Sequence, residues 1–168
     1  MAVLVLVAWA PVARAITGPG AGRAPHQSAS STHAARIQVL RLDARLVQSK
    51  LLDLDDVGFG LGDQAVFADE LRAAPNGRNV GFDGGVCTVV RVDDAVAGSG
   101  ILQCLVTIAV KGGTITTQGL STVKNLTPVG MEIVAITGGT GRFQFAQGQG
   151  LITSVGAGKA LVELVITT

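Results

Sequence analysis

From residue 36 onward, apolar and polar residues alternate in short runs that are separated by glycine, aspartate and asparagine. Alternation with a period of two places successive side chains on opposite faces of a β-strand, and no sustained 3.6-residue repeat indicates a helix. The pattern therefore predicts eight strands, in the segments RIQVLRLDARLV, DQAVFADEL, GGVCTVVRV, ILQCLVTIAV, GTITTQG, MEIVAIT, RFQFAQGQGLITSV and KALVELVITT.

Eight short strands favour an all-β fold that closes into an antiparallel up-and-down barrel, because closure leaves no sheet edge exposed. A barrel of this size is either filled by side chains or holds one small ligand. Its function therefore depends on which side chains point inward.

The strand at 101–110 has one wholly apolar face, which we expect to point into the barrel. That face consists of Leu102, Cys104, Val106, Ile108 and Val110. In the preceding strand, Cys87, Val89 and Arg91 share a face by the same alternation. These three side chains are therefore expected to point inward too.

The two cysteines are candidates for a disulfide. DDAVAGSG forms the turn between their strands, and symmetric pairing about it sets Cys87 opposite Cys104. Cross-strand Cβ atoms lie about 4.5–5.5 Å apart, close enough for a modest adjustment to close the bond. Two buried thiols, or one thiol lining a pocket, are the alternatives.

The stretch AITGGTGRFQFAQGQG, residues 135–150, resembles a phosphate-binding loop in its glycine content. A P-loop needs Lys followed by Ser or Thr after its glycines, and a dinucleotide site needs a helix there. Arg142 and an alternating strand pattern follow instead, so GGTG is interpreted as a tight hairpin turn. Phe143 and Phe145 are then expected to share one face and pack the barrel.

The N-terminus predicts secretion. Residues 1–15, MAVLVLVAWAPVARA, form an apolar run that is too short to span a membrane and ends in a small-x-small pattern. We interpret it as a signal peptide, with an apolar N-terminus of a cytosolic protein as the alternative. Residues 16–35 are rich in Gly, Pro, Ser and Ala and predict a disordered linker before the barrel at 36–168.

Composition excludes several classes of function. The chain has 168 residues, 15% of them charged, and a formal net charge of +1, so nothing favours a nucleic-acid partner. Its two histidines, His26 and His33, lie in the predicted linker. A barrel without histidine cannot carry a Ser-His-Asp triad, and we predict no metal or other cofactor.

Three segments resemble a known superfamily. FGLGDQAVFADEL at 59–71, VGFDGGVCTVV at 80–90 and the GGTG stretch resemble the allene oxide cyclases, and the last is similar to plant dirigent proteins. The resemblance covers about residues 37–168 and implies an eight-stranded antiparallel barrel with an internal hydrophobic cavity. Such cyclases close a five-membered ring in an unsaturated fatty-acid epoxide, whereas dirigent proteins orient radicals made by a separate oxidase.

The resemblance also assigns candidate catalytic residues. Cys87 matches the cysteine of the cyclases, and Asp69 stands where cyclases have asparagine and dirigent proteins have a pocket aspartate. Ala44 takes the place of the cyclase glutamate, and Phe82 and Leu120 take the places of dirigent arginines. Neither catalytic set is complete, which favours a different substrate.

Asp69 is the predicted general acid or base. By alternation it shares a face with Phe67 and Ala65, and apolar walls disfavour a charged carboxylate and raise its pKa. The alternative is that Asp69 caps the strand end or pairs with Arg72 or Arg78. The predicted ligand-binding residues are Phe67, Val89, Arg91, Cys104, Val106 and Ile108.

Two functions of different classes follow. The first is a secreted cyclase or isomerase, or a dirigent-type guide with a partner oxidase, acting on a small hydrophobic molecule. The second is a non-catalytic carrier of a lipid or other hydrophobic ligand. KALVELVITT is apolar on both faces and permits a homo-oligomer, a dimer or trimer, as in the cyclases.

Overall fold

A computed structural model describes residues 35–54, 58–156 and 158–168. The predicted signal peptide and all but the last residue of the predicted linker lie outside these residues. Within the described part of the chain, no helix is long and apolar enough to cross a membrane.

The described residues form strands joined by short turns and one 3-10 turn. In chain order the elements are β1 (Ile37–Leu52), β2 (Gln64–Ala73), β3 (Asn79–Asp94), β4 (Ser99–Val110), β5 (Gly113–Lys124), β6 (Thr127–Pro128), β7 (Met131–Gly139), η1 (Gly141–Phe143), β8 (Gln147–Gly156) and β9 (Lys159–Thr167).

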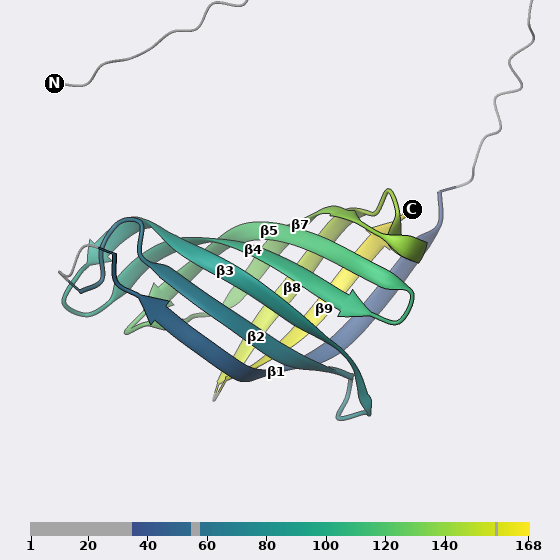
Figure 1. The fold of residues 1–168 in the computed structure, drawn as a ribbon, viewed down its shortest axis with the longest axis horizontal. Helices are drawn as coiled ribbons and strands as arrows, with labels where there is room; N and C mark the ends of the chain where they lie inside the picture. The colour runs from purple at the N-terminus through teal and green to yellow at the C-terminus, as the bar shows by residue number, and fades with distance from the viewer. Residues whose placement is uncertain (1–34, 55–57, 157) are drawn as a thin grey trace, which may run out of the picture. The chain divides into compact units, whose positions relative to one another are not determined.

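Eight of these strands close into a barrel (Figure 1). The hydrogen-bonded order is β4-β3-β2-β1-β9-β8-β7-β5, and β4 also pairs with β5, which closes the ring. Every pairing is antiparallel. The two-residue β6 only extends the end of β5. The predicted eight-stranded antiparallel barrel is confirmed.

Two separate groups of buried apolar side chains fill the barrel. The first cluster consists of Leu42, Ala44, Leu71, Ile108, Ile115, Ile136, Phe143, Ala146, Val162, Leu164 and Ile166. The disulfide cluster consists of Cys87, Val89, Leu102 and Val123, with Phe59, Ala65, Phe67, Val92 and Cys104 packed against it. The members that lie on strands occupy every second position, the inward-facing one, as the period of two requires. Phe59, Phe143 and Ala146 come from the segments between strands.

The predicted pairing of the cysteines is confirmed. Cys87 on β3 lies directly opposite Cys104 on β4, and their sulfur atoms are bonded at 2.01 Å. The bond joins neighbouring strands on the inner face, within the disulfide cluster. It closes a loop with a sequence separation of 17 residues.

Removing this disulfide is expected to destabilise the barrel by about 3 kcal/mol, because the unfolded chain regains the entropy of a loop of this length. Denaturant unfolding of the wild type, with and without reductant, measures the effect. The Cys87→Ala/Cys104→Ala variant is the control, since reductant has no bond to cleave in it. Two titratable thiols in denatured, unreduced wild type would contradict the bond.

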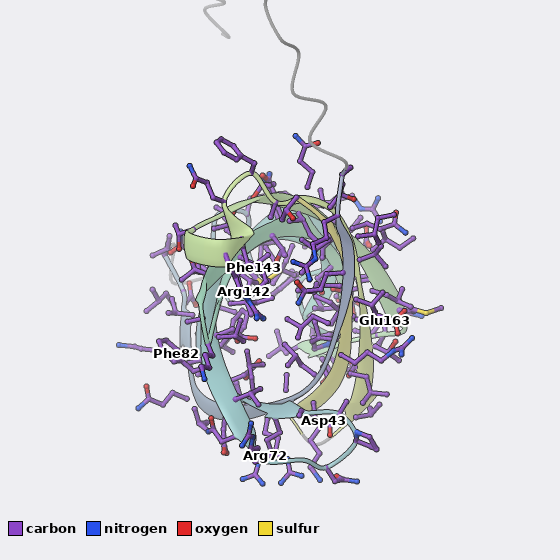
Figure 2. All side chains as sticks on the ribbon, turned by 90° about the vertical axis from the view of Figure 1, so that its right-hand side faces the viewer. Asp43, Arg72, Phe82, Arg142, Phe143 and Glu163 are labelled. Atoms are coloured by element: carbon purple, nitrogen blue, oxygen red, sulfur yellow. A yellow bond between two sulfur atoms is a disulfide. The ribbon has the colours of Figure 1, made fainter. Side chains whose placement is uncertain are left out.

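The GGTG stretch does form a turn, with Gly141 at a φ of +61°, a conformation that favours glycine. The strand does not resume at once, however, because η1 follows and β8 begins only at Gln147. Phe143 is 1% exposed and lies inside the ring of strands (Figure 2), whereas Phe145, at a φ of +65°, is 76% exposed. The prediction that both rings pack the barrel is wrong for Phe145, because irregular backbone between them breaks the alternation.

Candidate functional site

Two aspartates face each other inside the barrel. Asp69 on β2 pairs in register with Asp83 on β3, and Asp83 in turn lies opposite Ile108 on β4. Asp69 is in phase with Leu71, which is fully buried, so its side chain points inward as predicted. Asp83 is only 4% exposed, and Asp69 is half-buried. We call Asp69 and Asp83 the acid pair.

Burial controls the protonation of the acid pair. Desolvation raises the pKa of both carboxyls, and the negative charge and hydrogen bonding of Asp69 raise the pKa of Asp83 further, to about 7. The hydrogen bond with Asp83 partly offsets the rise for Asp69. Below about pH 7, Asp83 is protonated and can act as the hydrogen-bond donor of the pair.

The predicted alternative partner of Asp69, Arg72, binds elsewhere. Its guanidinium Nη2 donates to Glu70 Oε1 over 3.0 Å on the other face of β2. Arg72 therefore does not neutralise Asp69, and burial beside this like charge keeps Asp83 protonated up to about pH 7. One member can donate a proton while the other accepts one.

One buried oxygen of the acid pair accepts no hydrogen bond from an N–H or hydroxyl group of the described residues. Asp83 Oδ1 is buried and receives no hydrogen bond from the described residues. Buried polar atoms in folded proteins are almost always hydrogen-bonded, so an unpaired one marks a position for a water molecule or a ligand. Within the described residues, no group of three or more His, Cys, Asp or Glu side chains is placed to hold a metal ion.

Most predicted ligand-binding residues lie on the inner wall near the acid pair. Phe67 packs closely over Gly85, where an added Cβ would lie 2.9 Å from the Phe67 ring. Phe67, Val89 and Cys104 belong to the disulfide cluster. Ile108 belongs to the first cluster, and Val106 packs against it.

Several inward-facing residues of this wall keep part of their surface exposed. Phe67, Asp69, Cys104 and Val106 are only half-buried.

Arg91 does not reach this wall. The β3–β4 register passes from Val89 opposite Leu102 to Arg91 opposite Ile101, so a β-bulge at Val90 inserts one residue into β3. A bulge reverses the face of the residues beyond it. Arg91 therefore points outward and pairs with Asp93 at 2.8 Å. The prediction that Arg91 faces the interior is wrong, because alternation cannot register an inserted residue.

Cys87 lies on the inner wall, but its sulfur is consumed by the disulfide. A cysteine acts as a nucleophile or proton donor only as a free thiol or thiolate. The described structure contains no free cysteine. With its sulfur in the disulfide, Cys87 offers no free thiol in this structure, and its catalytic role stays a prediction.

Sequence reasoning missed several polar residues of the interior, among them Asp83, Thr117, Ser121 and Glu132. Ser121 is 5% exposed, and its hydroxyl donates to Glu132 Oε1. Alternation carried back from Cys87 reaches Asp83, but the predicted strand began one residue too late. The same alternation along β7 places Glu132 in phase with the buried Val134. The inward direction of these residues could thus have been predicted by counting in steps of two from residues already known to point inward.

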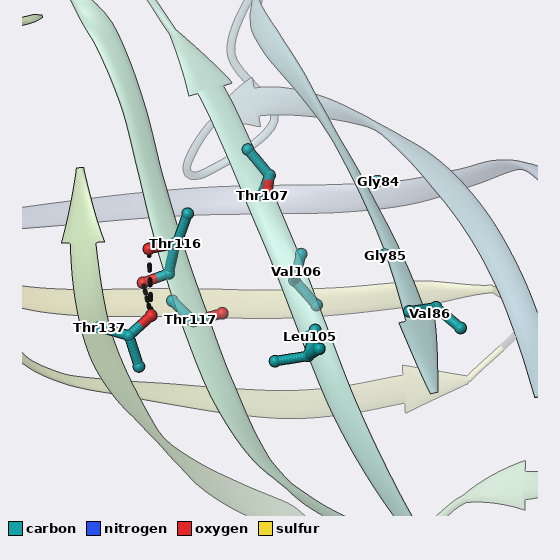
Figure 3. Close-up of a pocket in the computed structure, with 9 residues that line it drawn as sticks. All are labelled: Gly84, Gly85, Val86, Leu105, Val106, Thr107, Thr116, Thr117 and Thr137. Carbon is teal, nitrogen blue, oxygen red and sulfur yellow. Dashed lines mark hydrogen bonds between the residues drawn. The ribbon is translucent and has the colours of Figure 1, made fainter. Parts of the chain in front are cut away.

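Two shallow grooves lie on the outside of the barrel. The first, about 360 Å³, is lined by residues of β3, β4, β5 and β7, including the exposed Leu105, Thr107 and Thr137 (Figure 3). Thr137 Oγ1 there donates to the Thr116 carbonyl over 3.2 Å. The second, about 470 Å³, lies over β1, β2 and β3 beside the exposed Phe82. The second groove is lined in part by Asp69 and Glu70, whereas no charged residue lines the first.

Solved structures with the same fold include proteins of several activities. A pyocyanin demethylase is 27% identical, with a TM-score of 0.64 over 77% of this chain and 99% of its own. The pterocarpan synthase dirigent protein GePTS1 is 21% identical, with a TM-score of 0.60 over 84% of this chain and 95% of its own. AbnU, an exo-specific intermolecular Diels-Alderase, is 11% identical, with a TM-score of 0.58 over 80% and 99%.

The sequence itself identifies the family. A comparison with curated proteins finds no significant match. The family of dirigent-like proteins, however, matches residues 26–168, which include the whole barrel. The same barrel is found in the dirigent protein GePTS1 and in the Diels-Alderase AbnU. The chain therefore belongs to the dirigent-like protein family.

Proposed function

We propose that the barrel binds a small hydrophobic molecule and steers its cyclisation, isomerisation or stereoselective coupling, with the acid pair as proton donor and acceptor. The observation that carries the proposal is the acid pair itself: two facing carboxyls on an apolar inner wall, one of them with a pKa of about 7. A catalytic acid or base works best when its pKa lies near the working pH.

Cyclisation or isomerisation by the acid pair needs no external reagent. Asp69 takes a proton from a carbon or oxygen of the substrate, and Asp83 delivers its proton to a second atom as the double bonds shift. The substrate keeps its composition and becomes an isomer. The proton on Asp69 then returns to Asp83 through the hydrogen bond between them, which restores the starting state. Proton transfer of this kind contributes about 10²–10⁴-fold in rate.

The apolar wall supplies the remaining effect. A flexible molecule held between the two clusters loses the freedom that opposes ring closure or selective coupling. Holding the reacting atoms in place contributes up to about 7–11 kcal/mol in favourable cases. In a coupling of radicals the barrel would only orient them, and a separate oxidase would generate them.

The relatives support chemistry on small organic molecules in such barrels. By their names, one is a pyocyanin demethylase, one a pterocarpan synthase and one a Diels-Alderase. The disulfide supports our proposal that the protein is secreted, because such bonds persist mainly in oxidising compartments.

The test is the stereochemistry of the products. We expect the folded protein, incubated with linear polyenes or with phenoxy radicals from an added oxidase, to give products enriched in one enantiomer on chiral chromatography. Protein unfolded by reduction and denaturant is the control and should give racemic products. Racemic products from the folded protein would indicate the non-catalytic carrier instead.

A further inference from the structure

A second polar site lies inside the barrel, on the strands β5 and β7. Ser121 is in phase with the buried Val123, and Glu132 is in phase with the buried Val134, so both side chains point inward. The Ser121 hydroxyl donates to Glu132 Oε1. We call these two residues the Ser–Glu pair.

The carboxyl of Glu132 retains unused acceptor capacity. An ionised carboxylate accepts about four hydrogen bonds, and among the described residues only Ser121 donates to Glu132. No ion pair in the described part of the chain involves Glu132. A half-buried carboxylate without a cation is costly unless further donors solvate it, so it favours a hydrogen-bond donor that enters the barrel.

The Ser–Glu pair is separated from the acid pair across the barrel. Asp69 lies opposite Leu46, whose amide donates to the carbonyl of Gly158 at the start of β9. Glu132 on β7 lies opposite Ile152 on β8, and Ile152 lies opposite Val162 on β9. The levels differ by four residues on this path, and by six residues in the opposite direction on the path through β3 and β4, where Ser121 lies level with Val89. Because β2 and β7 are four strands apart either way around the ring, the two pairs lie on opposite walls of the barrel.

The wall beside the Ser–Glu pair is apolar. Val134, Leu164 and Val162 are 5%, 0% and 6% exposed, and all three point inward. A ligand that reaches both polar sites therefore needs an apolar body with one polar group at each end. The two ends differ, because the acid pair both donates and accepts a proton whereas the Ser–Glu pair presents an acceptor.

We propose that the Ser–Glu pair is a specificity site that binds a hydroxyl or amino group at the far end of the ligand. The ligand class is then an apolar molecule with two polar ends, one donating to Glu132 and the other reaching the acid pair. This inference rests on the proposed function, because it assumes that the ligand of the barrel lies against the acid pair.

The experiment compares three probes that differ only in their donors: biphenyl, its para-monohydroxy derivative and its para,para′-dihydroxy derivative. Calorimetry measures their affinities for the wild type, for Glu132→Gln and for Glu163→Gln. Glu163 is the matched control, because the same substitution there falls on the outer face, where Glu163 pairs with Arg41 (Figure 2).

We expect Glu132→Gln to weaken binding of the dihydroxy probe about tenfold or more, the worth of a charge-assisted hydrogen bond. Biphenyl should bind the wild type and both variants equally, and Glu163→Gln should change nothing. A loss of similar size for all three probes would overturn the inference, since it would reflect altered packing. An unchanged preference for the dihydroxy probe in Glu132→Gln would overturn it too.

The outcome separates this inference from the proposed function. If the wild type binds none of the probes, interior binding fails, and the inference fails with it. If the probes bind but Glu132→Gln leaves their order unchanged, only the Ser–Glu pair is excluded. The acid pair is then still tested by the stereochemistry of products.

Discussion

The free energy of unfolding is expected to fall by on the order of 4 kcal/mol as the pH rises from about 4 to about 7, owing to Asp83 alone. Its carboxyl has a pKa near 3.8 in an unfolded chain and about 7 in the barrel. Between these values the folded state binds the proton and the unfolded state does not, so unfolding releases a proton. Each pH unit in this window costs about 1.36 kcal/mol of stability.

The sign distinguishes Asp83 from an ordinary aspartate. A carboxylate with a lowered pKa in the fold stabilises it at high pH, whereas Asp83 stabilises it only while protonated. Its contribution is therefore complete below about pH 4 and lost as the pH reaches about 7. Burial raises the pKa of Asp69 and of Glu132 as well, which adds to the fall.

Asp83→Asn isolates the contribution. An asparagine keeps the size of the side chain, and its amide group can still donate to Asp69, but it cannot ionise. We expect the variant to lose most of the decline and to be more stable than the wild type at pH 7. Urea unfolding at several pH values measures the difference, and the other carboxyls cancel in the comparison.

Asp93→Asn is the matched control on the same strand, because Asp93 lies on the outer face and pairs with Arg91. Its slope against pH should follow that of the wild type. Equal slopes for Asp83→Asn and the wild type would contradict the raised pKa of Asp83.

Asp69→Asn is expected to lower turnover of a substrate of the barrel by about 10²–10⁴-fold, the contribution of a placed acid or base. Binding should change little, because the amide has the same shape and the apolar wall remains. Initial rates and affinities for one substrate, measured on the same preparation, test the two expectations separately.

The double variant Asp69→Asn/Asp83→Asn sharpens the test. Groups that pass one proton between them act as a unit, so the second substitution should add little to the first. Glu70→Gln is the control, since Glu70 follows Asp69 on β2 but binds Arg72 and Asn79 outside the barrel. Independent, multiplying losses from the two aspartates would argue against a shared proton, and unchanged turnover in Asp69→Asn would exclude its role.

The strands of the barrel were predictable because alternation is a local property of the chain. Each of the eight expected segments overlaps a strand of the barrel, with boundaries that moved by a few residues. The inward face of β4 followed from its apolar residues. Symmetric pairing about one short turn was enough to place Cys87 opposite Cys104. The inward direction of Asp69 followed from Phe67 two residues earlier.

The errors lie where the backbone departs from regular alternation. A bulge at Val90 sends Arg91 to the surface, and an irregular segment around η1 separates the exposed Phe145 from the buried Phe143. An inserted residue shifts every later side chain by one position, and nothing in the composition of these segments marks the insertion.

By itself, the sequence determined the all-β class, the closed barrel and the direction of most side chains, because these depend on neighbours two residues apart. Apart from the two cysteines, only the tertiary structure showed which inward-facing side chains contact each other. The acid pair exists because the register of β2 against β3 sets Asp69 opposite Asp83, and the Ser–Glu pair exists because β5 lies beside β7. Register is a relation between distant segments, and the proton chemistry of the interior depends on it.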